Sequence, residues 1–261
     1  MSGSIRRDVK APQGALIPLP MFSYACSQTA AQHPLASFRT PVDGPELEIV
    51  RLFCETLPAR APRNRATTVF LEPRIAGCFP DVVIVQWDPA IAAAWVPARE
   101  HLESGDTFWL HYLHQVGTLD PTVLCERLGR KRGLQTWERL LAAEVGRQAG
   151  DRLRRKPLAE TYAIKRLVAV EAKIGNWRRG LEQAFQNTWF ASESFLLLDR
   201  LEGKDDLFLR AADLGIGLIE PAHGIDDSRL PARCGKHPVS QASWLFNECV
   251  RRDGPNTASR H

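Results

Sequence analysis

Two short runs, at 82–85 and 167–170, are apolar at every position and constrain the fold more than any other feature of the chain. A strand with no polar face has to lie inside a sheet that is covered on both sides. The covering layers are available, because amphipathic patterns at 45–57 and 177–191 have the spacing of helices with one buried face. The sequence therefore predicts an α/β fold with a sheet between helices.

The remaining patterns give the order of elements and a division into segments. Strands are expected at 67–71, 82–87, 167–170, 195–198 and 214–219, and helices at 45–57, 177–191, 205–212 and 240–250. The segments are an irregular N-terminal arm (1–40), a core in two parts (41–100 and 160–225), an inserted helical and basic segment (101–159), and a C-terminal helix and tail (226–261). The core order is α-β-β-(insert)-β-α-β-α-β.

Positive charge is concentrated in one stretch of the chain. The formal net charge is +4, but 127–156 holds ten basic residues against three acidic ones. That local excess of seven leaves the remainder at −3. Clustered lysine and arginine are typical of a surface that binds a polyanion, although a solvated helix surface would give the same pattern.

The inserted segment has the pattern of three short helices followed by a turn. One apolar stripe is expected on Phe108, Tyr112, Leu113 and Val116, Asp120-Pro121 starts a second helix, and 134–145 carries a third stripe. This order resembles a winged helix-turn-helix, in which the third helix enters the DNA major groove. A helical cap on the main domain, a lid or a contact in a homodimer would also fit.

Basic side chains in this segment and after the second apolar run are candidates for nucleic-acid contacts, although a solvent-facing role would also fit. The candidates are Arg130, Lys131, Arg132, Arg139, Arg154 and Arg155 in the inserted segment, with Arg178 and Arg179 at the start of the helix expected from 177.

Export and membrane insertion are not expected. The longest apolar run, 90–96, has seven residues, whereas a membrane helix needs roughly 20. The N-terminus lacks the charged-then-apolar pattern of a signal peptide. Six cysteines lie at least 15 residues apart and form no C-x-x-C pair, so we expect reduced thiols in a cytoplasmic protein without a membrane partner.

Carboxylates border both of the fully apolar runs. Asp81 precedes the first, and Glu171-Ala172-Lys173 follows the second. Glu171 and Lys173 project from the same face of a strand, because side chains alternate. Two carboxylates at neighbouring strand ends can hold Mg²⁺, and a lysine beside them can orient water or stabilise phosphate charge. The pattern [DE]-x-K occurs three times, but only this copy follows a buried strand.

These residues resemble the PD-(D/E)xK phosphodiesterase superfamily. The match rests on Gly77-x-x-Pro80-Asp81 and on the Glu171-x-Lys173 motif, which correspond to the two acids and the lysine of the family. The family often has a glutamate in its first helix, where Glu46 fits better than Glu48. Some members carry a glutamine on the helix after the third strand, and Gln183 takes that place.

The resemblance implies a restriction-endonuclease-like αβββαβ core around a mixed sheet and a metal-dependent nuclease acting on nucleic acid, which we expect to be DNA. Asp81, Glu171 and Glu46 would hold Mg²⁺, for which Mn²⁺ could substitute, while Lys173 and Gln183 would orient the water. The products would be a 5′-phosphate and a 3′-hydroxyl. Asp81 and Glu171 are 90 residues apart, a longer gap than is usual in the family, and the inserted segment fills it. The alternative is a DNA-binding protein that uses the same fold as a scaffold and does not cleave.

Overall fold

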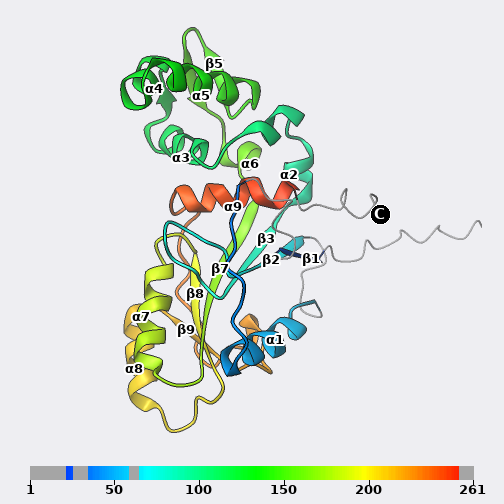
Figure 1. The fold of residues 1–261 in the computed structure, drawn as a ribbon, viewed down its shortest axis with the longest axis vertical. Coiled ribbons are helices and arrows are strands. Elements are labelled where there is room, and N and C mark those ends of the chain that lie inside the picture. The colour runs from blue at the N-terminus through cyan, green and yellow to red at the C-terminus, as the bar shows by residue number, and fades with distance from the viewer. Residues whose placement is uncertain (1–21, 26–34, 59–64, 253–261) are drawn as a thin grey trace, which may run out of the picture.

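The computed structural model describes residues 22–25, 35–58 and 65–252. Their centre is a mixed six-stranded sheet with helices on both faces (Figure 1). The strands are β1 (Phe22–Ala25), β2 (Ala66–Leu71), β3 (Val82–Trp87), β7 (Ile164–Lys173), β8 (Glu193–Leu198) and β9 (Gly217–Ile219), in the spatial order β1-β2-β3-β7-β8-β9. The expected α/β class is confirmed.

Strand directions change across the sheet. β3 runs antiparallel to both of its neighbours, β2 and β7. β8 runs parallel to β7, and β9 runs parallel to β8. The helix α7 (Trp177–Asn187) makes the crossover from β7 to β8 that a parallel pair requires.

Alternate residues of the apolar runs face opposite helical layers. Val82 and Ile84 pack with Phe53 of α1 (Pro45–Thr56) on one face of the sheet. Val83 and Val85 pack on the other face, in the same core as α9 (Gln241–Arg252). The helices α7 and α8 (Asp205–Leu214) share a third apolar cluster with β8 and β9. The fully apolar runs are thus covered on both sides, as their sequences predict.

The part of the chain that follows β3 and precedes β7 in the sequence forms a second substructure. It contains α2 (Pro89–Ala93), the 3₁₀ helix η3 (Pro97–His101), α3 (Asp106–Val116), β4 (Thr118–Leu119), α4 (Pro121–Leu128), α5 (Arg130–Ala142), β5 (Gly146–Ala149), β6 (Arg152–Arg155) and α6 (Leu158–Thr161). The three strands form a separate antiparallel sheet in the order β4-β6-β5. In Figure 1 this part is green and lies beyond α9.

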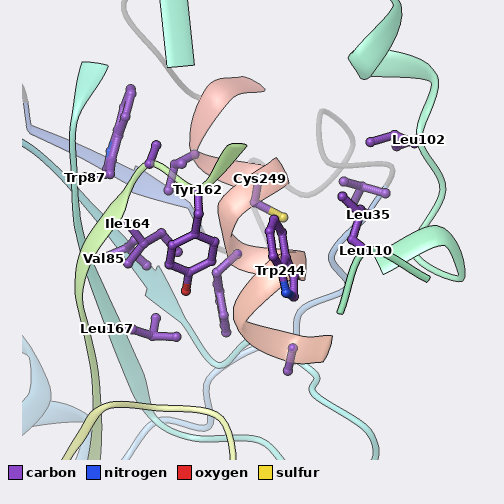
Figure 2. Packing of buried hydrophobic residues seen from close by; sticks show 14 of the residues in the cluster. Leu35, Val85, Trp87, Leu102, Leu110, Tyr162, Ile164, Leu167, Trp244 and Cys249 are labelled. Atoms are coloured by element: carbon purple, nitrogen blue, oxygen red, sulfur yellow. The ribbon is translucent and has the colours of Figure 1, made fainter. Parts of the chain in front are cut away.

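α9 joins the second substructure to the main sheet. Trp244 and Cys249 of α9 belong to the same apolar cluster as Leu110 of α3 and Ile164 of β7, which lie in the two parts that α9 connects (Figure 2). The rings of Tyr162 and Trp244 meet edge to face at 5.0 Å between centroids. The two parts therefore share one continuous apolar core.

The structure corrects several expectations. The arm predicted to be irregular contains β1, which pairs with β2 in parallel, whereas 1–21 and 26–34 lie outside the described residues. The predicted buried face of α3 is right at Leu113 but wrong at Phe108 and Val116, which are exposed, while Trp109 and Leu110 are buried instead. Leu134 of α5 is exposed as well.

Some boundaries also move. α5 begins at Arg130, four residues before the predicted helix, and ends at Ala142. α7 ends at Asn187 instead of residue 191, because the chain passes through a short turn before β8. Leu214, expected to open a strand, is the last residue of α8, and Gly215 ends that helix with a left-handed conformation at φ 73°.

Within the described part of the chain, no helix is long and apolar enough to cross a membrane. The five cysteines described there, Cys54, Cys78, Cys125, Cys234 and Cys249, are free thiols, and Cys26 lies outside the described residues.

Candidate active site

A polar cavity of about 650 Å³ opens where β3 begins and β7 ends. The residues predicted for the site, which come from α1, the β3 entrance, β7 and α7, all contribute to its lining. These residues are Glu46, Asp81, Glu171, Lys173 and Gln183. Residues far apart in the sequence meet here because β3 pairs with β7, with Val82 opposite Val170.

The turn before β3 positions Asp81. Ala76 and Gly77 adopt positive φ angles of 47° and 92°, which reverse the chain between β2 and β3. The Asp81 carboxylate then reaches the end of β7, where its Oδ2 accepts a hydrogen bond of 2.7 Å from the Ala172 N–H. Burial raises the pKa of Asp81, and the Ala172 N–H opposes this effect by stabilising the ionised form.

Glu171 is the most deeply buried acid of the site, with 2% of its surface exposed. Burial, followed by the negative charge of Asp81, raises the pKa of Glu171 to about 8, and Lys173 partly opposes the rise. If both were ionised, Asp81 and Glu171 would place two negative charges close together in a poorly solvated region. A proton on one of them, or a bound cation, removes this repulsion.

The Lys173 ammonium lies among three oxygen atoms. Its Nζ donates to the Ala172 carbonyl oxygen at 2.7 Å and lies 3.5 Å from Glu171 Oε1 and 3.5 Å from Glu46 Oε2. A Cβ added at Gly180 of α7 would lie 2.7 Å from Lys173 Cγ. The absence of a side chain at Gly180 therefore lets α7 approach the lysine closely.

Two amides of α7 face the same region. The Oε1 atom of Gln183 is buried and has no hydrogen-bond partner among the described residues. Such a group costs free energy unless water or a ligand satisfies it. The Asn187 Nδ2 atom lies 3.5 Å from Glu171 Oε2. Asn187 was missed from the sequence, where a polar residue four positions after Gln183 on a predicted amphipathic helix was the available signal.

Arg39 and Glu72 form a second charged pair beside Asp81 that the sequence did not indicate. Arg39 Nε donates to Glu72 Oε2 at 3.0 Å, and Arg39 also lines the cavity. Burial and then the Asp81 charge raise the pKa of Glu72, and Arg39 opposes the rise. Arg39 thus contributes a guanidinium, paired with Glu72, to the lining of the cavity.

The metal ligands predicted from the sequence do not form one closed set. Among residues 22–25, 35–58 and 65–252, no three His, Cys, Asp or Glu side chains are grouped as a metal site. Glu46 is the predicted ligand that does not join the other two, because half of its side chain is exposed and its carboxylate faces the Lys173 ammonium. Asp81 and Glu171 do fit a hard divalent cation, since both are oxygen donors, Glu171 is buried and Asp81 partly so, and Asp81 disfavours the charged form of Glu171.

The basic residues at the start of α5 are exposed. Arg130, Lys131 and Arg132 occupy the first turn of the helix, and none of them forms an ion pair within the part of the chain that the structure describes. Positive charge at this end opposes the helix dipole and is unfavourable for the helix itself. Its presence there is easier to explain by an anionic ligand than by stability.

The other basic residues of the inserted segment that were predicted to contact nucleic acid differ in their surroundings. Arg139 is partly buried and donates two hydrogen bonds to Asp106, of 2.8 and 2.9 Å, so its guanidinium already has a protein partner. Arg154 and Arg155 are both exposed, and Arg155 donates to the His114 carbonyl oxygen at 2.9 Å.

The two arginines at the start of α7 also have different surroundings. Arg178 stacks on Trp177 and lies 3.4 Å from Asp206, on the outer side of α7. Arg179 lines the cavity that holds Asp81 and Lys173. Of the two, Arg179 is therefore the one placed to meet a ligand there.

No protein-family model matches this chain, and neither the curated proteins nor the solved structures that were searched contain a match. What the protein does must therefore be inferred from its own residues.

Proposed function

We propose that this protein is a metal-dependent nuclease of the PD-(D/E)xK type that hydrolyses phosphodiester bonds in DNA. The observation that carries the proposal is the meeting of Asp81, Glu171 and Lys173 at one cavity, although 90 residues separate the two acids. A buried acid pair beside a lysine suits the reaction, which needs a cation site and a positive group near the developing phosphate charge.

The order of elements supports the same assignment. α1, β2, β3, β7, α7 and β8 follow one another around the second substructure in the αβββαβ order expected of a restriction-endonuclease-like core. The three antiparallel strands followed by a helical crossover to parallel β8 also fit that core. This coincidence of topology and motif is harder to obtain by chance than either one alone.

The cavity residues divide the reaction between them. Asp81 and Glu171 would hold Mg²⁺, and Mn²⁺ could replace it. Such an ion, when bound, makes a coordinated water more acidic and offsets phosphate charge. The Lys173 Nζ, which now contacts the Ala172 carbonyl, donates to the attacking water or to a phosphate oxygen. The unpartnered Gln183 Oε1 accepts a hydrogen bond from that water and fixes its direction.

The second substructure is proposed as the DNA-binding part. Its order α3-β4-α4-α5-β5-β6, with a small sheet β4-β6-β5, follows the winged helix-turn-helix plan. α5 would then enter the major groove, with Arg130, Lys131 and Arg132 near phosphates or base edges. We expect the protein to work on DNA in the cytoplasm.

The test is cleavage of supercoiled plasmid and of labelled single strands with Mg²⁺, Mn²⁺ or EDTA. We expect metal-dependent cutting by the wild type and a loss of at least about 100-fold in Lys173→Met and Asp81→Asn, typical of removing a group that acts in the transition state. The chain offers a matched control, because Glu202-Gly203-Lys204 repeats the motif outside the cavity. Lys204→Met should cut like the wild type.

Other outcomes separate the alternative. Salt-sensitive DNA binding without cleavage of any substrate would favour the non-cleaving scaffold protein. Equal cutting by the wild type and both cavity variants would refute the nuclease assignment of this site.

A further inference from the structure

We infer that the protein cuts duplex DNA about one helical turn or more away from the base pairs that α5 contacts. The inference rests on the proposed nuclease function and adds to it the form of the substrate: a continuous duplex long enough to reach from α5 to the cavity.

The pairing of β3 with β7 puts the two functional regions at opposite ends of the sheet. Trp87 pairs with Ile164 at one end, and Val82 pairs with Val170 toward the other. Residues 88–163 leave and re-enter the sheet at the first end, so the second substructure is attached there. Asp81 and Lys173 lie at the second end.

The length of β7 gives a scale for their separation. Nine residue steps from Ile164 to Lys173, at ~3.3 Å each, span about 30 Å. Figure 1 shows α4 and α5 further still from the sheet, beyond α9, while α1 and the start of α7 lie toward the opposite end. At ~3.4 Å per base pair, 30 Å corresponds to about nine base pairs of DNA.

The second substructure is fixed to the core and cannot bring α5 to the cavity without breaking buried contacts. Arg99 of η3 forms an ion pair of 2.7 Å with Glu248 of α9, and both side chains are only 2% exposed. Arg251 of α9 donates to the Val96 carbonyl oxygen at 2.8 Å. Within the substructure, Arg139 of α5 is bound to Asp106 of α3.

The ligand that suits this arrangement is B-form DNA. Its major groove admits an α-helix, whereas the major groove of an RNA duplex is too deep and narrow for side chains to read. Duplex DNA also stays nearly straight over this distance, because its persistence length is about 150 base pairs. When one straight duplex binds both regions, the distance between α5 and the cavity therefore sets the distance along the DNA between the contacted base pairs and the cut.

The experiment maps contact and cut in the same molecules. Leu134 is 41% exposed on α5, one helical turn from Lys131. Replacing Leu134 by the photocrosslinker p-benzoylphenylalanine, with irradiation in EDTA on an end-labelled duplex of about 36 base pairs, marks the bases beside α5. Mg²⁺ is then added and the nicks are mapped in the crosslinked species, so a fixed binding sequence is not needed. The same crosslinker at Leu209, which is 69% exposed on α8, is the matched control and should give background crosslinking only.

We expect nicks about nine base pairs or more from the crosslink, and poor cutting of duplexes of about 12 base pairs or fewer. Nicks within half a helical turn of the crosslink, roughly five base pairs, would overturn the inference. Cutting without crosslinking at Leu134 would also overturn it while leaving the nuclease function in place. Crosslinking without any cutting would instead refute the proposed function, and the inference with it.

Discussion

The buried acid pair makes stability depend on pH in a way that one substitution removes. The perturbation is Glu171→Gln, which keeps the shape of the side chain and its contact distance to Asn187 but cannot ionise. The pKa of Glu171 is raised from 4.5 to about 8 in the folded protein, chiefly by burial and then by Asp81. Because the folded state holds the proton more tightly than the unfolded chain, unfolding releases a proton between these two pH values.

The direction of the change in stability with pH follows from this release of a proton. Below pH 4.5 Glu171 is protonated in both states and costs nothing. As the pH rises toward 8, the wild type loses stability, and above 8 the loss is complete. The difference between about 8 and 4.5, at ~1.4 kcal/mol for each pH unit, gives an upper bound of about 5 kcal/mol. With structural relaxation around the charges we expect about half of that.

The assay is urea unfolding in EDTA at about pH 5 and pH 8, where linkage predicts the contrast. Glu171→Gln should gain about 2 kcal/mol or more relative to the wild type between these two pH values. Added Mg²⁺ should restore stability at pH 8 to the wild type more than to the variant. Glu182→Gln, a change at an exposed position of α7, is the control and should follow the wild type. A difference between Glu171→Gln and wild type that is the same at both pH values would refute the reasoning.

Three further substitutions test other contacts. Gly180→Ala places a Cβ 2.7 Å from Lys173 Cγ, so single-turnover cleavage should slow by about tenfold or more while DNA binding is retained; an unchanged rate would contradict the close approach. Glu248→Gln removes the charge that balances buried Arg99 and should lower the free energy of unfolding by about 3 kcal/mol in urea titration. Gly133→Ala would bring a Cβ to 2.6 Å from the α4 backbone and should cost about 1–3 kcal/mol. A melting temperature equal to that of the wild type would show that α4 and α5 are not in such tight contact.

The sequence was most informative where the local pattern and the tertiary environment agree. Val82–Trp87 is buried at every position, and its fully apolar run at 82–85 predicted a central strand without knowledge of its neighbours. Asp120-Pro121 also predicted its helix start correctly, because the Asp120 side chain caps the Thr122 N–H locally, at 2.8 Å. Such features need few distant partners, and the sequence contains them entirely.

Contacts between distant segments explain the errors. α3 contains adjacent aromatic residues, Phe108 and Trp109, and only the docking of α9 decides which of them is buried. Arg139 counted as surface charge in the sequence because its partner Asp106 lies 33 residues earlier, on another helix. β1 is four residues long, and its pairing with β2 defines it more than its own composition does.

The residues of the candidate site also fall into two groups, those that the sequence indicates and those that it does not. The Glu171-x-Lys173 motif and Asp81 could be selected because each borders an apolar run that is visible in the sequence. Arg39, Asn187 and Gly180 carry no such mark, since each is defined by a contact with a distant segment: with Glu72, Glu171 and Lys173 respectively.

The most direct test of the central claim is the chemistry of the cut ends in ¹⁸O-labelled water. Hydrolysis at the Asp81–Glu171–Lys173 cavity predicts fragments with a 3′-hydroxyl and a 5′-phosphate that carries one ¹⁸O atom, formed only with Mg²⁺ or Mn²⁺. The Asp81→Asn protein, prepared in parallel, should give no labelled product. A 3′-phosphate end, an unlabelled 5′-phosphate, or the same labelled product from Asp81→Asn would contradict the account.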